Sequence, residues 1–489
     1  MPYHRAVFAF LTSKRAEEYH HFMKIRNLWI IGLTGITCFL GLFLATSSGV
    51  KDDPGRVVSD IDPLKSVIIL PPASDERREI YTLYEDSPFV VLNYFDGMVQ
   101  QHEKLSELLK AHGVHTLSVV DLLENAILNA RKAGKLEGAL AEIFPGQFPR
   151  LKDKLPLITA SIMLGRDPNF FFTYNKKGYL DPLIPLSGAF YYTRDFAVST
   201  PRGIIITNPR SKWRKHEHLI GRFLFRFADE LKAHPIVFDA EAEGVRCEGG
   251  DIIVKDEKTI LMGIGNFSDR EAALKIAQKL NLDVLGVSMP PIEKFSGANF
   301  EIMHLDTVFN LVDQKKILTV PYFFLKKYAI DNPIVKYLSA VHDRPKKEPG
   351  KGELDFPPSL KTAIDSIPKV GWLTLFRAGT GEAKELEKKL GDYLVEQGYE
   401  VIPVGGERGD LREDQYLDER VLYELSLQAA NVVQLGPGKV IAYAHNKYTN
   451  EALRKRGVKV LAFEGKYLAD SLGGPHCLTM PLVRMKNPD

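Results

Sequence analysis

One cysteine near the end of the chain lies among residues that suit a nucleophile. Cys477 follows the run Gly473-Gly474-Pro475-His476. Upstream, a histidine and several carboxylates occur in three short runs: Thr193-Arg194-Asp195, Glu248-Gly249-Gly250-Asp251 and His304-Leu305-Asp306. A thiolate that attacks an ordinary carbonyl needs a histidine and one orienting group. Because the carboxylates exceed that need, we interpret the attacked group as a cation.

Each candidate residue also has a purely structural interpretation. A cysteine near the end of a chain is often a small buried apolar residue, and Asp195 has the residue type of a turn. His304 and Asp306 are two residues apart. In a strand, both side chains would therefore lie on one face, which favours a site. We expect Cys247 to be a packing residue.

Composition excludes some functions. The 489 residues carry 64 basic and 62 acidic side chains, and 45% of them are hydrophobic. A nucleic-acid-binding protein needs a clustered basic surface, so we expect no nucleic-acid partner. The three cysteines are too few for a disulfide framework. No run of residues has metal-ligand spacing or forms a glycine-rich phosphate loop, so we expect no metal or organic cofactor.

The first 50 residues have the composition of a targeting segment. Residues 28–44 are apolar and uncharged, follow Lys24 and Arg26, and lead into small residues. This order predicts a signal peptide or signal anchor over 1–50 and a catalytic domain over 51–489. The domain would be exported or membrane-anchored, with membrane contact only through this segment, or cytoplasmic if the leader is not used. Translation starts at Met1 or Met23.

A helix that passes into a short strand recurs along the domain. The pattern covers residues 102–117, 216–238, 269–287, 382–404 and 449–463. An open parallel sheet gives the same alternation. The motifs lie near the boundaries of separate units, however, and this favours a radial arrangement around one centre. We also expect a helical insertion at about 122–178 and a mobile loop, rich in proline and charge, at 342–358.

From about Val57 onward the chain resembles arginine deiminase, of the guanidino-group-modifying superfamily that includes the amidinotransferases. The resemblance lies in five blocks that occur in the family's order. They are Tyr192-Thr193-Arg194-Asp195, Glu248-Gly249-Gly250-Asp251, the run Met303-His304-Leu305-Asp306-Thr307-Val308-Phe309, Gly436-Pro437-Gly438 with Asn446 and Thr449-Asn450, and the Gly473-Gly474-x-x-Cys477 end.

The resemblance implies a five-bladed, pseudo-fivefold α/β propeller of ββαβ-type units with a helical insertion. It also implies hydrolysis of L-arginine to citrulline and ammonia through a covalent thiouronium intermediate on Cys477. In that family pattern His304 is the acid and base, Glu248 orients it, and Asp195 and Asp306 bind the guanidino group. The family positions that hold the substrate carboxylate fall on Arg214 and Arg270.

Two departures from the family pattern concern the amino-acid end of the substrate. The family usually has an arginine where this chain has Leu472, and an asparagine where it has Ala189. L-arginine remains the predicted substrate, and another guanidino compound is the alternative. An amidinotransferase and a catalytically silent, membrane-tethered guanidino-binding protein are further alternatives. A cysteine–histidine peptidase fits least, because it has no use for paired carboxylates. A homo-oligomer stays open.

Overall fold

The computed structural model describes residues 56–72, 95–166, 172–174, 180–182, 184, 189–211, 214–290, 302–342 and 358–485. The chain divides into two units, Met1–Asp53 and Pro54–Asp489. The expected leader, and residues 343–357 of the expected loop, lie outside the described residues. No helix in the described ranges is both long enough and apolar enough to cross a membrane.

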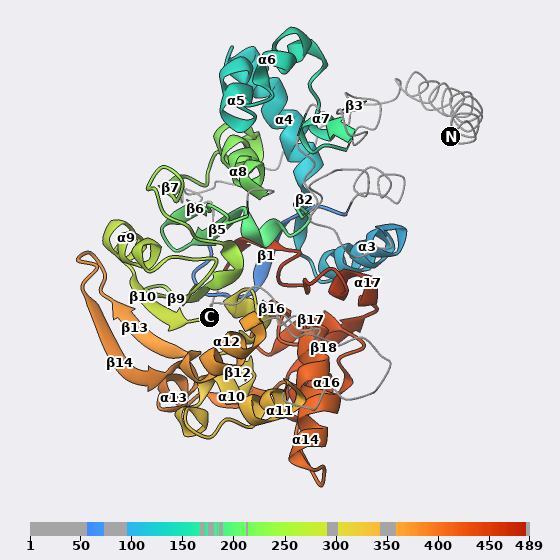
Figure 1. Ribbon diagram of the computed structural model, residues 1–489. Helices are drawn as coiled ribbons and strands as arrows, with labels where there is room; N and C mark the ends of the chain where they lie inside the picture. The colour runs from blue at the N-terminus through green and yellow to red at the C-terminus, as the bar shows by residue number, and fades with distance from the viewer. Residues whose placement is uncertain are drawn as a thin grey trace, which may run out of the picture. The chain divides into compact units, whose positions relative to one another are not determined.

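Five sheets of this mixed α/β fold share one pairing pattern (Figure 1). In each sheet a central strand pairs antiparallel with one neighbour and parallel with the other. The triplets are β19 (Met480–Arg484), β1 (Leu64–Ile69) and β2 (His115–Ser118); β5 (Ala197–Thr200), β6 (Gly203–Ile206) and β7 (Ile236–Asp239); β8 (Ile252–Asp256), β9 (Thr259–Ile264) and β10 (Asp283–Ser288); β11 (Phe309–Asp313), β12 (Lys316–Thr319) and β15 (Glu400–Pro403); and β16 (Val433–Gly436), β17 (Lys439–Tyr443) and β18 (Lys459–Phe463).

A helix lies between the parallel strands of most triplets, as right-handed crossovers require. These helices are α3 (Phe95–Ala111), α8 (Lys215–Phe227), α9 (Arg270–Leu280) and α16 (Lys447–Lys455). The first triplet joins the two ends of the domain, because β1 pairs with the last strand, β19. Four of the five helix–strand units expected from the sequence have this form.

Contacts between sheets pass from each triplet to the next. Strand β19 contacts β5, β11 contacts β17, and β1 contacts β16. Three helical turns provide the remaining contacts: η3 (Thr193–Asp195) touches η6 (Gly249–Asp251), and η6 touches η7 (Leu305–Thr307). Each triplet therefore touches two others.

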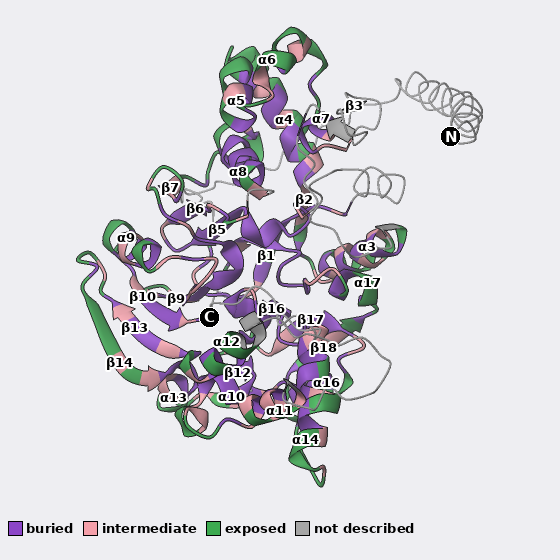
Figure 2. Cartoon of the chain, in the orientation of Figure 1, coloured by how far each residue is buried: buried purple, intermediate pink, exposed green. Residues whose placement is uncertain are grey.

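The unit expected over 382–404 is wrong in its first half. Residues Ala383–Lys389 form a strand, β14, and the helix α13 covers only Leu390–Val395. The sequence of β14 is rich in Lys and Glu, which favour helices. It nevertheless pairs antiparallel with β13 (Trp372–Phe376), which extends the β8–β10 sheet. Backbone pairing outweighs the local preference, and β14 lies exposed at the edge of the molecule (Figure 2).

Among its described residues, the segment 122–178 contains four α-helices, the short 3₁₀-helix η2 (Lys152–Leu157) and one strand. The helices are α4 (Val119–Lys132), α5 (Leu136–Ile143), α6 (Phe148–Leu151) and α7 (Ala160–Met163), and α4 and α5 pack on α8. The strand β3 (Phe172–Tyr174) pairs with β4 (Leu180–Pro182). Helix α4 begins where the Ser118 hydroxyl accepts the Asp121 N–H at 3.5 Å. One face of the helix carries apolar residues at helical spacing that are buried, and burial of each Val, Leu or Ile among them stabilises by about 1.5–3 kcal/mol.

Candidate active site

The motifs occupy equivalent positions in the five triplets. Three of them are the helical turns η3, η6 and η7, which come just before the first strands β5, β8 and β11. Cys477 comes just before β19, and Asn431 comes just before β16. In each triplet, therefore, the candidate side chains come from the segment just before the first strand of the antiparallel pair.

Hydrogen bonds connect these five segments in a closed circuit. Every link uses a backbone group of one segment and the backbone or a side chain of the next. The links are Arg194 N–H to Cys477 O (3.2 Å), Gly250 N–H to Asp195 Oδ1 (3.1 Å), Leu305 N–H to Asp251 Oδ1 (3.0 Å), Asn431 Nδ2 to Asp306 O (3.2 Å) and Cys477 N–H to Asn431 Oδ1 (3.0 Å).

The two glycines of the Glu-Gly-Gly-Asp run allow this close approach. A Cβ atom at Gly249 would collide with the carbonyl oxygen of Arg194. A Cβ atom at Gly250 would collide with the imidazole of His304. The glycines therefore let η6 pack between its two neighbours, which is the physical reason for the motif.

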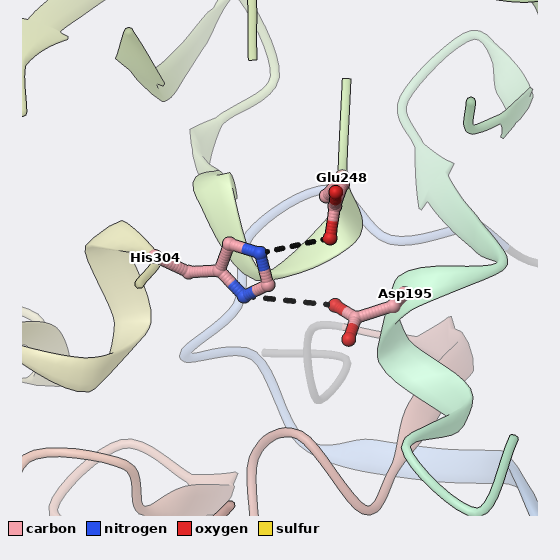
Figure 3. A group of neighbouring side chains, drawn as sticks. All are labelled: Asp195, Glu248 and His304. Atoms are coloured by element: carbon pink, nitrogen blue, oxygen red, sulfur yellow. Dashed lines mark hydrogen bonds and ion pairs between the residues drawn. The ribbon is translucent and has the colours of Figure 1, made fainter. Parts of the chain in front are cut away.

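His304 lies between two carboxylates (Figure 3). Its Nε2 is 3.1 Å from Glu248 Oε2, and its Nδ1 is 3.9 Å from Asp195 Oδ1. All three side chains are at most 4% exposed. We call Asp195, Glu248, His304 and Arg214 the carboxylate–histidine cluster.

The carboxylates keep the imidazole protonated. Burial acts to lower the pKa of His304, but Asp195, Glu248 and Asp251 outweigh it and raise the pKa from 6.5 to about 10. Asp251 itself accepts hydrogen bonds from Leu305 N–H and Ser268 Oγ, at 3.0 and 2.6 Å. Burial raises the pKa of Asp251 to about 7 despite those bonds.

Arg214 balances the charge of the same carboxylates. Its Nη1 donates to Asp195 Oδ2 at 2.7 Å and is 4.0 Å from Glu248 Oε2, while its Nε donates to Glu217 at 2.8 Å. Burial acts to raise the pKa of Asp195, but Arg214 and His304 outweigh it and lower the pKa. Arg214 thus pairs with Asp195, the carboxylate that the family resemblance assigns to binding the guanidino group of the substrate. Its Nη2 also reaches the carbonyl oxygen of Ala189, at 3.4 Å.

Arg270 makes its contacts at a sheet surface. Its guanidinium donates to Thr374 Oγ1 at 3.2 Å and to Glu385 at 3.0 Å, and it stacks over Phe376 at 5.1 Å. The side chain is 53% exposed. The structure therefore groups Arg214 with the motif residues and gives Arg270 partners on β13 and β14.

Three side chains of the carboxylate–histidine cluster could also hold a metal ion. Ligand atoms of Asp195, Glu248 and His304 lie within 4.8 Å of one another. The guanidinium of Arg214 contacts Asp195 and faces Glu248, so it already supplies a positive charge there. A metal cation at this point would meet that charge at short range.

A second group of side chains surrounds the sulfur, and we call Cys477, Asp306, Asn431 and His476 the thiol cluster. Cys477 Sγ is 3.5 Å from Asp306 Oδ2, which also pairs with His476 Nδ1 at 2.7 Å. Asn431 Nδ2 donates to Sγ at 3.0 Å. Burial raises the pKa of Cys477 well above 9, and the charges of Asp306 and Asp195 raise it further. The sulfur is therefore a neutral thiol in this state of the protein.

One sequence expectation about the two central residues is wrong. His304 and Asp306 were expected on one face of a strand, but residues 305–307 form a helical turn. His304 consequently joins the carboxylate–histidine cluster, and Asp306 joins the thiol cluster. Cys247 is buried among apolar residues of β8, β9 and α9.

The sequence interpretation missed Asn431 and His476. Asn431 stands alone before an apolar strand, a setting in which asparagine is an ordinary turn residue. Asn431 can be identified because it precedes the first strand of its triplet, as the other four segments do. This signal is visible only once the boundaries of the units are known. His476 was visible beside Cys477 but was not assigned a role.

Comparison with known proteins agrees with this site. A family model described as arginine deiminase matches residues 172–484.

The chain belongs to the arginine deiminase family.

Among curated relatives, the arginine deiminase of Clostridium perfringens is 25% identical over 465 residues, which are 89% of this chain and 99% of the relative. The enzyme of Metamycoplasma arthritidis is 23% identical and covers 88% and 96% of the two chains. The likeness to solved structures is looser. DDAH from Pseudomonas aeruginosa, in complex with citrulline, gives a TM-score of 0.42 at 14% identity, with 86% of this chain and 99% of that one covered.

Proposed function

We propose that this family member hydrolyses the guanidino group of L-arginine to citrulline and ammonia, through a covalent intermediate on Cys477. The closed circuit of hydrogen bonds carries the proposal, because it brings a thiol, a protonated histidine and three buried carboxylates to one place. The full-length alignment with arginine deiminases supports it.

The substrate cation supplies the charge that the thiol lacks. Asp306 Oδ2 lies 3.5 Å from the sulfur, and the charges of both Asp306 and Asp195 oppose ionisation of Cys477. A guanidinium is planar and protonated, and its N–H edges suit paired carboxylates. When it binds to them, its charge offsets theirs and lowers the pKa of the thiol, so Cys477 releases its proton to solvent and the thiolate faces the guanidinium carbon.

The reaction then needs one proton given and one proton taken. The Cys477 thiolate attacks the guanidinium carbon, and the carbon–nitrogen bond to one amino group breaks as His304 protonates that nitrogen. Ammonia leaves, and a thiouronium remains on the sulfur. His304, now neutral, takes a proton from water, whose oxygen attacks the same carbon. The carbon–sulfur bond breaks, and citrulline and the thiol are released.

The raised pKa of His304 fits the first of these steps. At about 10, it leaves the imidazolium as the resident form at neutral pH, ready to donate. Glu248 accepts from Nε2 and so fixes the ring orientation. After the donation, the same carboxylates favour the return of a proton to His304, which takes it from water.

Another guanidino compound is the second candidate substrate. Leu472 replaces the arginine expected at this family position, and it adopts a left-handed backbone with φ of 73°. Its apolar side chain offers no charge to a substrate carboxylate. The replacement of arginine by Leu472 would therefore weaken the binding of L-arginine more than the binding of a guanidino compound that lacks the amino-acid end. The same covalent intermediate given to an amine would make the enzyme an amidinotransferase.

Product analysis tests the proposal directly. The full chain and Cys477→Ser are incubated with L-arginine, and citrulline and ammonia are measured, with Cys247→Ser as the matched buried-thiol control. We expect turnover in the parent and the control and a loss of about 10⁴-fold or more in Cys477→Ser. Turnover that survives in Cys477→Ser contradicts the mechanism. No turnover in the parent, but amidino transfer to added amines, contradicts hydrolysis.

We also infer that the five triplets close as a five-bladed propeller. The run of contacts from each triplet to the next supports this inference. For the leader we propose a signal peptide or anchor over residues 1–50, on the basis of its basic and apolar runs. Mass spectrometry of the N-terminus after cell fractionation tests it, and a soluble protein that begins at Met1 would contradict it.

A further inference from the structure

We infer that Asn431 is a fifth catalytic residue, whose amide N–H stabilises the thiolate of Cys477. The inference rests on the proposed function in one respect, that Cys477 is the nucleophile. Asn431 is fully buried, and its Nδ2 is 3.0 Å from Cys477 Sγ. It therefore touches the atom that would react.

The hydrogen-bond network fixes which end of the amide faces the sulfur. The backbone N–H of Cys477 can only donate, and it lies 3.0 Å from Asn431 Oδ1. The other end lies 3.2 Å from the carbonyl oxygen of Asp306, which can only accept. Both contacts require oxygen on the Cys477 N–H side and nitrogen on the Asp306 side. The nitrogen that remains beside Sγ is therefore a donor.

The backbone holds this side chain against the nucleophile. His476 N–H donates to the Asn431 carbonyl oxygen at 3.3 Å, so the two segments are bound at the main chain as well as at the side chain. Gly474 makes the approach feasible, since a Cβ atom there would collide with Asn431. The second glycine of the Gly-Gly-x-x-Cys run thus has a specific reason to be glycine.

Electrostatics around the sulfur give the contact its importance. Burial and the carboxylates of Asp306 and Asp195 all oppose the thiolate, whereas the Asn431 side chain and, to a smaller extent, the Gly474 backbone lower the pKa of Cys477. A donor to a charged partner contributes more than a donor to a neutral one. Its loss should raise the pKa further, so that about tenfold to hundredfold less thiolate is present at a fixed pH.

The pH dependence of alkylation measures this pKa without substrate turnover. The full chain and its variants are treated with iodoacetamide from pH 6 to 11, and modification of the Cys477 peptide is quantified by mass spectrometry. Asn431→Ala removes the donor. Asn431→Asp keeps the shape and the acceptor for the Cys477 N–H but places a carboxylate oxygen beside Sγ.

Asn310→Ala is the matched control. Asn310 is equally buried, and its Nδ2 donates to the carbonyl oxygens of Ala430 and Val432, on either side of Asn431. It therefore supports the same segment without touching the sulfur. Circular dichroism verifies the fold of every variant, and Asn431→Asp decides the test if Asn431→Ala does not fold.

We expect the alkylation rate at a given pH to fall about tenfold or more in Asn431→Ala and further in Asn431→Asp, with Asn310→Ala within about twofold of the parent. Equal rates in the parent and both Asn431 variants would overturn the inference. An equal fall in Asn310→Ala would also overturn it, because the role would then be structural. A parent that alkylates as expected but does not turn over L-arginine contradicts the proposed function alone.

Discussion

The carboxylate–histidine cluster and the thiol cluster differ in the charges that surround them. In the first, two carboxylates face the charged groups of Arg214 and His304 at distances of 2.7 to 4.0 Å. In the second, the sulfur is a neutral thiol beside the carboxylate of Asp306, and the side chain that donates to it is the amide of Asn431. One half of the site has a resident positive charge, and the other half lacks one.

This difference explains how a buried thiol can wait without reacting. The pKa of Cys477 stays high until a cation arrives, because burial and nearby carboxylates disfavour the thiolate. The pKa of His304 stays high throughout, because its carboxylates are part of the protein. In the proposed mechanism, the proton donor is thus ready in the free protein, and the nucleophile becomes active only with bound guanidinium.

The largest expected effect comes from removing the proton donor of the first cluster. His304→Asn keeps a planar polar side chain but cannot donate and then take up a proton. We expect kcat to fall by about 10²–10⁴-fold, the usual contribution of a general acid and base. The measurement is ammonia release under saturating L-arginine, with the covalent adduct on Cys477 followed by mass spectrometry.

His112→Asn serves as the control for this change. His112 lies in the turn that follows α3 and pairs with the Leu108 carbonyl oxygen, at 2.8 Å. We expect its kcat to match that of the parent. A kcat in His304→Asn within about threefold of the parent would show that another group moves the proton.

A smaller effect separates two roles of Arg214. Arg214→Ala removes the internal guanidinium from Asp195 Oδ2. If Arg214 competes with the substrate guanidinium, agmatine, which has no carboxylate, should bind about tenfold more tightly to the variant. If Arg214 also binds the substrate carboxylate, L-arginine should bind more weakly to the same variant.

Isothermal titration of both ligands into Cys477→Ser, with and without Arg214→Ala, measures the two effects while preventing turnover. Lys215→Ala, which removes an exposed neighbouring charge, is the control and should change neither affinity by more than about twofold. Weaker agmatine binding in Arg214→Ala would mean that Arg214 orients Asp195 for the substrate and does not compete with it.

The smallest expected effect concerns backbone strain beside the thiol cluster. Leu472 has a φ of 73°, a left-handed conformation that costs a residue with a Cβ atom roughly 1–2 kcal/mol. Leu472→Gly and Leu472→Ala both remove the side chain, but only glycine removes the strain. We expect the glycine variant to be more stable than the alanine variant by about 1 kcal/mol in urea unfolding. Equal stability of the two variants would show that the turn relaxes.

The sequence named the candidate site residues but did not predict how they group. Cys477, His304, Glu248, Asp195 and Asp306 were identified by type and spacing, and the structure brings them into one hydrogen-bonded circuit. The division into two clusters was not predicted, because it depends on the helical turn at residues 305–307. Side chains two residues apart lie on the same face in a strand but not in a helical turn, so the strand pattern gave the wrong orientation for His304 and Asp306.

The fold shows the same limit at β14. Its residues favour a helix by local propensity, and a strand results because β13 offers backbone partners. The pairing of β14 with β13 forms only on folding, so the local sequence of β14 does not reveal it. Asn431 is a similar case, since an isolated asparagine has no motif.

By itself the sequence determined the reactive residue types, four of the five helix-to-strand units and the glycines of the motifs. These follow from covalent chemistry and short-range periodicity, which are local. Only the tertiary structure decided that Arg214 lies on Asp195, that Arg270 pairs with Glu385, and that Asn431 completes the surroundings of Cys477. These contacts join residues from separate units, and their geometry exists only after the units have packed.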